Sequence, residues 1–256
     1  MKYYTTTKYN CGIDLHSKQM YVCIMDREGR ILLHRNIRGN DFAFFLKLVK
    51  PYLHDLTVVC ECTFNWYWLA DACFAAGIQF VLAHALYLKH IHGGKNKNDR
   101  IDSEKLAHLL RANLIPPAYV YPAARRPIRA LLRQRMSYVW QRSELLTHLS
   151  MNQMAQGLVP AAKCGHNREV WEERILEQYE NPLHRFGASR DMEIVKAYDA
   201  QIEMLDQKLE HLAKAYDERD YRLVLTTPGI GRVLGLTILY EMDTVKRFPT
   251  DKDFLS

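Results

Sequence analysis

Residues 98–107 read NDRIDSEKLA, and they open an amphipathic helix that we expect to run to about Leu114. Residues three and four positions apart share one face of a helix. Asp99, Asp102 and Leu106 therefore lie roughly in line. Asp99 and Asp102 therefore point toward the same element that the leucines of this helix pack against. The helix thus carries both core residues and the acids of a charged site.

Two further acids, Asp14 and Glu61, interrupt apolar runs that are typical of buried strands. Strand interiors disfavour acidic side chains, and an unpaired buried carboxylate is costly. If Asp14, Glu61, Asp99 and Asp102 meet at one place, they repel one another unless a divalent cation lies between them. An oxygen-only ligand set suits Mg²⁺ or Mn²⁺. The four acids therefore predict a metal site.

Each acid also has a simpler explanation that the sequence leaves open. Asp99 can cap the helix, with Asp102 three residues later in a plain capping arrangement. His16 lies close to Asp14 in the sequence, and we expect it to be a hydrogen-bonding neighbour of that acid rather than a metal ligand.

The order of the expected elements indicates an α/β fold with a mixed sheet. Three strands form a meander over residues 11–37, and a helix follows at 42–53. Residues 57–62 form a short apolar strand of the kind that is buried on both faces. A helix at 65–76 and a strand at 79–83 complete the layout before the acidic helix.

The composition is that of a soluble globular protein, with 48% hydrophobic and 25% charged residues in 256. The N-terminus lacks the apolar core of a signal peptide, and no apolar run approaches membrane-spanning length. Six cysteines occur without a CxxC pair, so we expect reduced thiols. These features predict a cytoplasmic protein with no membrane partner.

The positive charge is concentrated in one segment. Residues 89–142 hold twelve Lys or Arg against three acids, whereas the rest of the chain holds 23 basic and 26 acidic residues. The net charge of +6 therefore comes from the region around and after the acidic helix. A basic surface beside a metal-binding acidic cluster suits a polyanionic backbone, with the metal acting at the scissile phosphate.

An expected helix at residues 125–157 carries arginines at four-residue spacing, with Tyr138 and Trp140 among them. Guanidinium groups on one stripe can bind successive phosphates, and aromatic rings can stack on exposed bases. A solvated helix face is the alternative. With neighbouring basic residues, the predicted nucleic-acid-binding set is Lys95, Lys97, Arg100, Arg125, Arg126, Arg129, Arg133 and Arg142.

Two patterns mark the C-terminal half. A heptad repeat over residues 195–216 predicts a coiled coil, which pairs with a second chain or folds back on the arginine-bearing helix; we favour self-association. Residues 226–235 place a glycine hairpin before an apolar helix, as in a helix-hairpin-helix element. Backbone amides at Gly229 and Gly231 would form an anion site for the DNA backbone.

The ordered combination of these motifs resembles the DEDD transposases of the insertion-sequence-110 family, relatives of the Piv invertases. The resemblance covers nearly the whole chain, with Ser103 at a position where the family usually has alanine. The residues that carry it are Gly12-Ile13-Asp14, Glu61-Cys62-Thr63 with Tyr67, residues 97–102, Leu106-Ala107, the arginine-bearing helix, residues 228–231 and Arg247-Phe248.

The resemblance implies a ribonuclease H-like (RuvC-like) catalytic domain at residues 1–118, an arginine-rich and coiled-coil region at 119–221, and the start of a C-terminal domain at 222–256. It implies that Asp14, Glu61, Asp99 and Asp102 hold Mg²⁺ or Mn²⁺ and are catalytic. It also implies DNA and a noncoding guide RNA as partners, a homo-oligomer, and metal-assisted strand cleavage and transfer in DNA transposition.

The family uses a C-terminal serine nucleophile beyond the arginine-phenylalanine segment. Ser256 falls before that position, so we carry no nucleophile over and expect an incomplete activity. The alternatives are an inactive nucleic-acid-binding remnant and a Holliday-junction-resolvase-like nuclease. A sugar-kinase-like ATPase is weaker, because His16 stands where the phosphate hairpin would need glycine.

Overall fold

The computed structural model describes residues 7–91, 98–160 and 168–255. Backbone contacts divide the chain into two compact units, Met1–Ala123 and Ala124–Ser256. The described part contains no helix that combines the length and the apolar character needed to cross a bilayer. Its five cysteines, Cys11, Cys23, Cys60, Cys62 and Cys73, are free thiols, whereas Cys164 lies outside the described residues.

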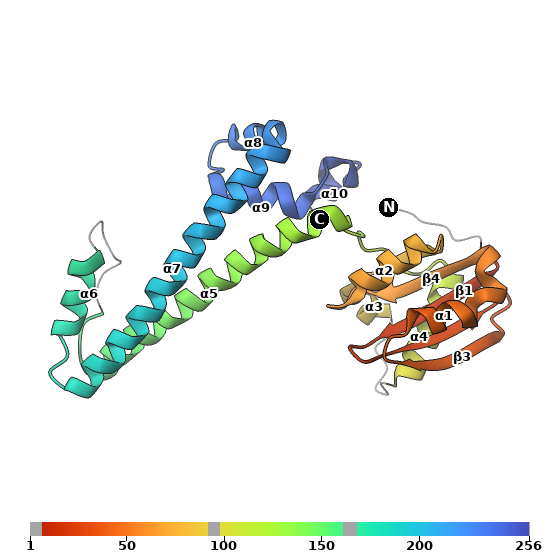
Figure 1. The fold of residues 1–256 in the computed structure, drawn as a ribbon, viewed down its shortest axis with the longest axis horizontal. Helices are drawn as coiled ribbons and strands as arrows, with labels where there is room; N and C mark the ends of the chain where they lie inside the picture. Colours follow the sequence, from red (N-terminus) through yellow and green to blue (C-terminus); the bar gives the residue numbers. More distant parts are fainter. Residues whose placement is uncertain (1–6, 92–97, 161–167, 256) are drawn as a thin grey trace. The chain divides into compact units, whose positions relative to one another are not determined.

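The first unit is built on a five-stranded mixed sheet, ordered β3-β2-β1-β4-β5 (Figure 1). The antiparallel meander consists of β1 (Tyr9–Leu15), β2 (Gln19–Met25) and β3 (Ile31–Arg38). On the other side of β1, β4 (Leu56–Glu61) and β5 (Gln79–Ala83) pair in parallel. This is the expected α/β layout, and it is consistent with a ribonuclease H-like domain.

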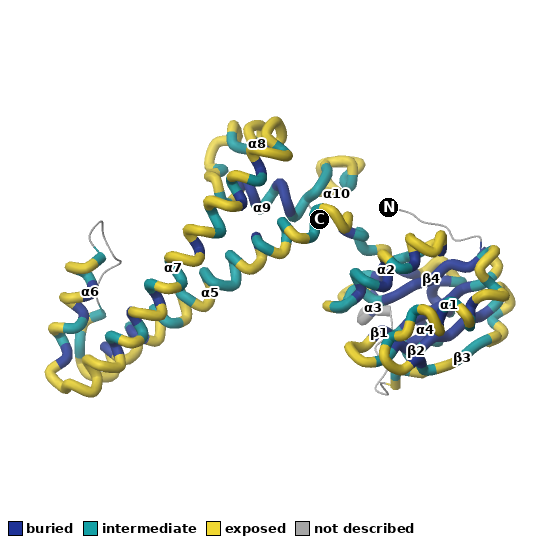
Figure 2. The backbone as a smooth tube through the Cα atoms, viewed as in Figure 1, coloured by how far each residue is buried: buried dark blue, intermediate teal, exposed yellow. Residues whose placement is uncertain are grey.

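Alternate strand residues face two different helical layers, because side chains along a strand point to opposite faces. One face, with Cys11 and Ile13, packs against α1 (Phe42–Val49) and α2 (Trp66–Ala75). The other face, with Val59, packs against α4 (Asp99–Arg111). The buried strands of this unit form the dark core in Figure 2.

Two details of this unit differ from the expected elements. The helix at 42–53 ends as α1 at Val49 and continues as a 3₁₀ helix, η1 (Lys50–Asp55), because Pro51 lacks an N–H for a further α-helical turn. A short helix, α3 (Ala85–Ile91), follows β5, at residues to which we assigned no element from the sequence.

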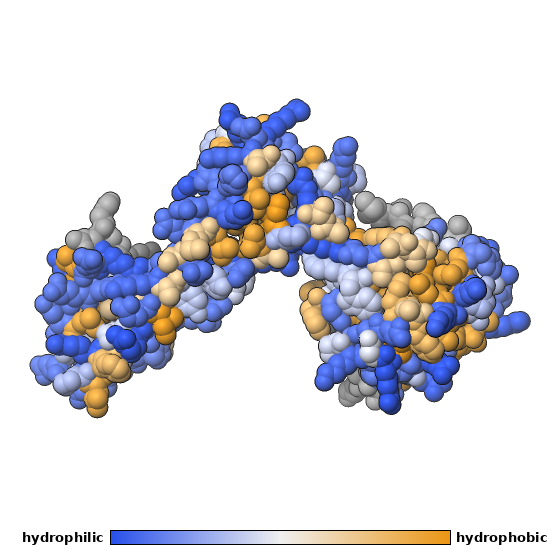
Figure 3. All heavy atoms as spheres, in the orientation of Figure 1, coloured by the Kyte–Doolittle hydropathy of each residue, from blue (hydrophilic) through white to orange (hydrophobic). Residues whose placement is uncertain are grey.

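The second unit is helical. Its long helices are α5 (Arg126–Ala155), preceded by η2 (Ala123–Arg125), and α7 (Pro182–Tyr216), with α6 (Arg168–Glu177) beside them. It continues through α8 (Glu218–Leu225), α9 (Arg232–Met242), η3 (Val245–Arg247) and α10 (Asp251–Leu255). Hydrophobic residues gather where α7, α8 and α9 meet (Figure 3).

The expected heptad positions on α7 face α5 of the same chain. Val195, Ile202 and Leu209 are buried, whereas Tyr216 is exposed. Ion pairs run antiparallel along the two helices, from Arg135–Asp206 at one end to His148–Asp191 at the other. The structure therefore shows the fold-back pairing within one chain, which was the alternative to the favoured self-association.

The two compact units do not coincide with the expected domains, whose limits stay predictions. The division between the two units lies at Ala123, five residues after the expected limit at 118. The expected limit at 221 falls inside α8, and residues 222–256 belong to the same compact unit as α5 and α7. Tyr221 explains this continuity, because it is buried in one cluster with Leu132 of α5 and Leu236 of α9.

Candidate metal centre

Asp14 and Glu61 stand at the C-terminal ends of adjacent parallel strands. The β1–β4 register pairs Ile13 with Cys60, so Asp14 and Glu61 are the next residues along the two strands. Two positions before Asp14 lies Gly12, which contacts α4, and two positions before Glu61 lies Val59, which shares a core cluster with the leucines of α4. The two acids therefore project from the α4 side of the sheet.

Helix α4 approaches β1 closely because position 12 is glycine. A Cβ atom at Gly12 would lie 2.2 Å from the Ser103 carbonyl oxygen and 2.5 Å from the Ala107 amide nitrogen. The first turn of α4 is further held on β3, where His34 Nε2 donates to the Arg100 carbonyl oxygen at 2.9 Å. These contacts fix the height and the angle at which Asp99 and Asp102 reach the end of β1.

Asp99 is not the cap of its helix. The Asn98 side chain caps α4 by accepting a hydrogen bond from the Arg100 amide at 3.0 Å. Asp99 instead accepts a hydrogen bond from Gln19 Nε2 of β2 at 3.0 Å. The simpler explanation of this acid as a capping residue is therefore wrong, and its carboxylate faces the sheet.

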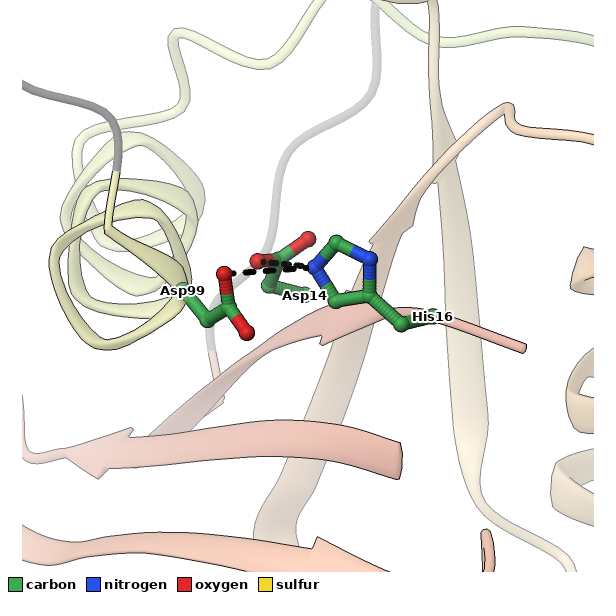
Figure 4. Close-up of side chains that lie close together, drawn as sticks. All are labelled: Asp14, His16 and Asp99. Atoms are coloured by element: carbon green, nitrogen blue, oxygen red, sulfur yellow. Dashed lines mark hydrogen bonds and ion pairs between the residues drawn. The ribbon is translucent and has the colours of Figure 1, made fainter. Parts of the chain in front are cut away.

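The Asp14 and Asp99 carboxylates converge on one imidazole nitrogen (Figure 4). His16 Nε2 lies 3.1 Å from Asp14 Oδ2 and 3.4 Å from Asp99 Oδ1. One ligand atom from each of the three residues falls within 4.8 Å of the others. His16 is thus the expected hydrogen-bonding neighbour of Asp14, and in addition it bridges to the helix.

Asp102 and Glu61 lie outside this group of three. Asp102 Oδ1 forms an ion pair with Lys105 Nζ at 3.2 Å, one turn along α4. Its charge still reaches Asp14, since Asp102 and Asp99 both contribute to raising the pKa of that acid. Glu61 is half-buried at the end of β4, one strand away from Asp14.

The electrostatics of Asp14 favour a cation at this place. Burial raises the pKa of Asp14 most, His16 lowers it, and Asp99 and Asp102 raise it again, so that the pKa lies above the ordinary value. The net effect means that a negative charge at Asp14 is poorly compensated by the protein alone. A divalent ion between these carboxylates would remove the imbalance, and carboxylates are the donors that Mg²⁺ and Mn²⁺ accept. The residues fit such an ion.

Two family models match the chain. The family model of the IS110-type DEDD transposases, described as a transposase, matches residues 11–155, which is more than half of the chain. A second model, described as the transposase IS116/IS110/IS902 family, matches residues 221–256. The chain belongs to the IS110 transposase family. No curated protein matches the chain.

The arginines predicted to bind nucleic acid in this transposase are engaged within the helical unit. Arg125 Nη2 lies 2.7 Å from Asp217 Oδ1, and its Nε lies 3.3 Å from Asp243 Oδ1. Arg129 and Arg133 both bind Glu241 of α9, at 2.6 and 2.7 Å. Arg142 pairs with Asp199 of α7. These guanidinium groups hold α5 against α7, α8 and α9, so phosphate contact by them remains a prediction.

The other predicted nucleic-acid contacts have varied positions. Lys95 and Lys97 lie outside the described residues. Arg100 is exposed on the first turn of α4, and Arg126 is half-buried at the start of α5. Gly229, with φ of +85°, and Gly231 are exposed in the turn between α8 and α9.

Four polar residues of the candidate centre were missed in the sequence. Gln19 binds Asp99, His34 holds the first turn of α4, and the Asn40 and Asn65 side chains both donate to the His16 carbonyl oxygen, at 2.9 and 3.0 Å. Asn40 and Asn65 carry no local signal of this role, because each acts across the fold. The one usable signal was that His34 inside β3 and Gln19 at the start of β2 are polar residues in strands.

Proposed function

We propose that this transposase carries out divalent-metal-assisted DNA strand cleavage and transfer during DNA transposition. The observation that supports the proposal most is the convergence of Asp14 and Asp99 on one point, with Glu61 on the adjacent strand of the same sheet face. In this proposal, acids from two parallel strand ends and from the start of α4 would together hold the cation. The family is one that generally depends on a divalent metal.

In the proposed mechanism, Asp14, Glu61, Asp99 and Asp102 hold Mg²⁺ or Mn²⁺. When bound, the ion supplies Lewis-acid stabilisation of the negative charge that develops on the phosphate. Asp99 lies in the first turn of α4, next to the helix N-terminus, where the helix dipole would attract the anionic phosphate as well as the carboxylate. Asp102 must leave its ion pair with Lys105 in order to bind the ion.

The polynucleotide partners are part of the same proposal. The basic segment at residues 89–142 supports binding of DNA, and of the guide RNA that the family resemblance implies. Arg100 is exposed in the same helix turn as the acids, and the exposed turn at Gly229 and Gly231 offers backbone amides to phosphate. We propose these residues as nucleic-acid contacts, with Arg125, Arg129, Arg133 and Arg142 acting first through their ion pairs.

Self-association through residues 195–216 is the remaining part of the proposal. The buried face of this stretch is occupied by α5, so a second chain would meet other side chains, such as Met204, which is 61% exposed. The molar mass in solution from light scattering tests this point. An unchanged monomer mass over a wide concentration range would contradict it.

The metal site is tested by Mg²⁺ and Mn²⁺ titration of the wild-type chain and of an Asp14→Ala, Asp102→Ala double variant. We expect loss of high-affinity binding in the variant and no loss in Asp220→Ala, an exposed acid of α8. Unchanged binding in the double variant would make the assignment wrong.

Cleavage is tested with branched and duplex DNA in either ion, with and without the guide RNA. Cleavage that the double variant lacks supports the proposal. Salt-sensitive nucleic-acid binding without any cleavage would favour the non-catalytic binding protein.

A further inference from the structure

His16 occupies the point at which the two best-placed carboxylates meet. Its Nε2 atom is 3.1 Å from Asp14 Oδ2 and 3.4 Å from Asp99 Oδ1, and Figure 4 shows the ring directed between the two acids. The sequence suggested that His16 is only a neighbour of Asp14. A ring that faces one carboxylate has that role, whereas a ring that faces two from different elements stands where a ligand of a shared ion would stand.

The backbone of His16 is fixed by residues from distant parts of the first unit. The His16 amide donates to the Gln19 carbonyl oxygen at 2.9 Å, which closes the turn between β1 and β2. The His16 carbonyl oxygen accepts hydrogen bonds from Asn40 Nδ2 at 2.9 Å and from Asn65 Nδ2 at 3.0 Å. Three contacts thus position one loop residue, and such support is typical of a side chain whose placement matters.

The ring is also accessible to ions. The His16 side chain is 49% exposed, whereas the Asp14 side chain beneath it is 16% exposed. An ion that arrives from solvent therefore meets the imidazole and Asp99 before it reaches Asp14. The three ligand atoms already lie within 4.8 Å of one another, so small side-chain rotations would bring them to a common ion.

Nitrogen in the ligand set changes which ion the site prefers. Mg²⁺ binds oxygen ligands and retains its waters, whereas first-row transition ions accept imidazole nitrogen. Ligation needs an Nε2 atom without a proton, so the ring would hold its proton on Nδ1 when the ion is bound. The hydrogen bond from Nε2 to Asp14 and a bond from Nε2 to an ion therefore exclude each other.

We propose that His16 Nε2 is a ligand of the divalent ion held by Asp14 and Asp99, and that this nitrogen makes the site select Mn²⁺ over Mg²⁺. The inference rests on the metal site of the proposed function. It adds a residue outside the four acids, and it gives that residue a role in the choice of ion. The competing arrangement is a histidine that only hydrogen-bonds to the acids and moves away when the ion enters.

Electron spin echo spectroscopy of Mn²⁺ bound to the 256-residue chain separates the two arrangements. We expect modulation from a directly bound ¹⁴N nucleus, and we expect it to change to the ¹⁵N pattern in protein made with ¹⁵N-histidine. His16→Gln keeps an amide donor for the acids but lacks the imidazole. It should lose the modulation, and its Mn²⁺ affinity should fall by about tenfold, while its Mg²⁺ affinity changes by less than about twofold.

His108→Gln is the matched control, since His108 is partly exposed near the other end of α4, where it faces Glu104. This variant should keep the wild-type modulation and affinities. If Mn²⁺ binds the wild-type chain, Asp14→Asn abolishes that binding, and no histidine nitrogen couples to the ion, the inference about His16 is overturned while the proposed metal site stands. If the wild-type chain binds neither ion, the proposed function itself fails.

Discussion

The Asp14 carboxylate carries its charge where the folded protein stabilises that charge less than water does. Its pKa is raised by burial and by Asp99 and Asp102, and His16 offsets only part of this effect. We therefore predict that Asp14→Asn raises the melting temperature in a chelator at pH 7. The same variant should lose the stabilisation that Mg²⁺ or Mn²⁺ gives to the wild type, since only a bound ion stabilises by mass action.

The pH dependence of folding stability follows from the direction in which the pKa of Asp14 is shifted. A folded-state pKa above the unfolded value means that folding takes up a proton, so stability falls as pH rises through the interval between the two values. The advantage of Asp14→Asn should therefore be small below that interval and full above it. Melting curves across pH, with Asp220→Asn as the surface control, measure this. A wild type that is more stable than the variant in chelator at pH 7 would contradict the prediction.

Gly12 is the residue that allows α4 to lie against β1. We predict that Gly12→Ala destabilises the first unit by about 3 kcal/mol, because the added Cβ would lie 2.2 and 2.5 Å from backbone atoms that no rotamer change can move. Chemical denaturation of the variant measures the loss. Metal binding should weaken as well, since Asp99 is carried on the same helix.

Gly187 supplies the opposite control. It lies in α7, and a Cβ atom there would meet nothing within 4 Å. Gly187→Ala should therefore stabilise the second unit by about 0.5–1 kcal/mol through helix propensity. A Gly12→Ala protein as stable as the wild type would show that α4 does not approach β1 in the way the structure has it.

At the scale of elements, α9 is attached to α5 through Glu241. Burial alone would raise the pKa of Glu241, but hydrogen bonds from Arg133 and Arg129 outweigh it and hold that pKa below the ordinary value. A lowered pKa gives stability that is present above the unfolded value and is lost as pH falls toward the folded one. We predict that Glu241→Gln costs the second unit about 1–2 kcal/mol at pH 7 and reduces its loss of stability below pH of about 4.5.

The same variant tests the role of the arginines. If Arg129 and Arg133 serve chiefly to hold α9, then Glu241→Gln releases them and should raise DNA affinity with a steeper salt dependence. If they already bind phosphate in the wild type, Arg133→Ala should lower DNA affinity without lowering the melting temperature. Filter binding at several salt concentrations, combined with melting curves, separates the two outcomes.

These ion pairs also show why the arginine-bearing helix was predictable as an element but not in its contacts. Spacing within residues 125–157 placed the helix to within two residues of α5. Its acids lie far away in the chain, with Glu241 separated from Arg129 by 112 positions and Asp217 from Arg125 by 92. The heptad on α7 had the same ambiguity, since α5 and a second chain would satisfy one pattern equally well.

The sheet and the acids were more accessible to prediction. An acid in an apolar strand run is a local signal, and β5 lies at the residues expected for it. The placement of His16 was not accessible, because it depends on a turn closed by Gln19 and held by Asn40 and Asn65. Local pattern thus identified the charged residues of the centre, whereas the contacts between them required the tertiary fold.

At the scale of the whole molecule, the carboxylates through which a metal ion would change stability and those through which low pH would change it lie in different units. Asp14, whose pKa is raised, and the candidate ion site belong to the first unit. The acids whose pKa is lowered by arginine or lysine, which include Glu172, Asp199, Glu210 and Glu241, belong to the second. Each unit also has its own hydrophobic clusters.

We therefore predict two calorimetric transitions that respond independently. Mn²⁺ at pH 7 should raise one transition and leave the other in place, while a shift to pH 4 in chelator should lower the second by more than the first. Asp14→Asn should remove the response to metal, and Glu241→Gln should lower the acid-sensitive transition at neutral pH. A single transition that moves with both treatments would mean that the two units unfold as one, and the stabilising effect of the ion would then extend through the chain to the helices that carry the arginines.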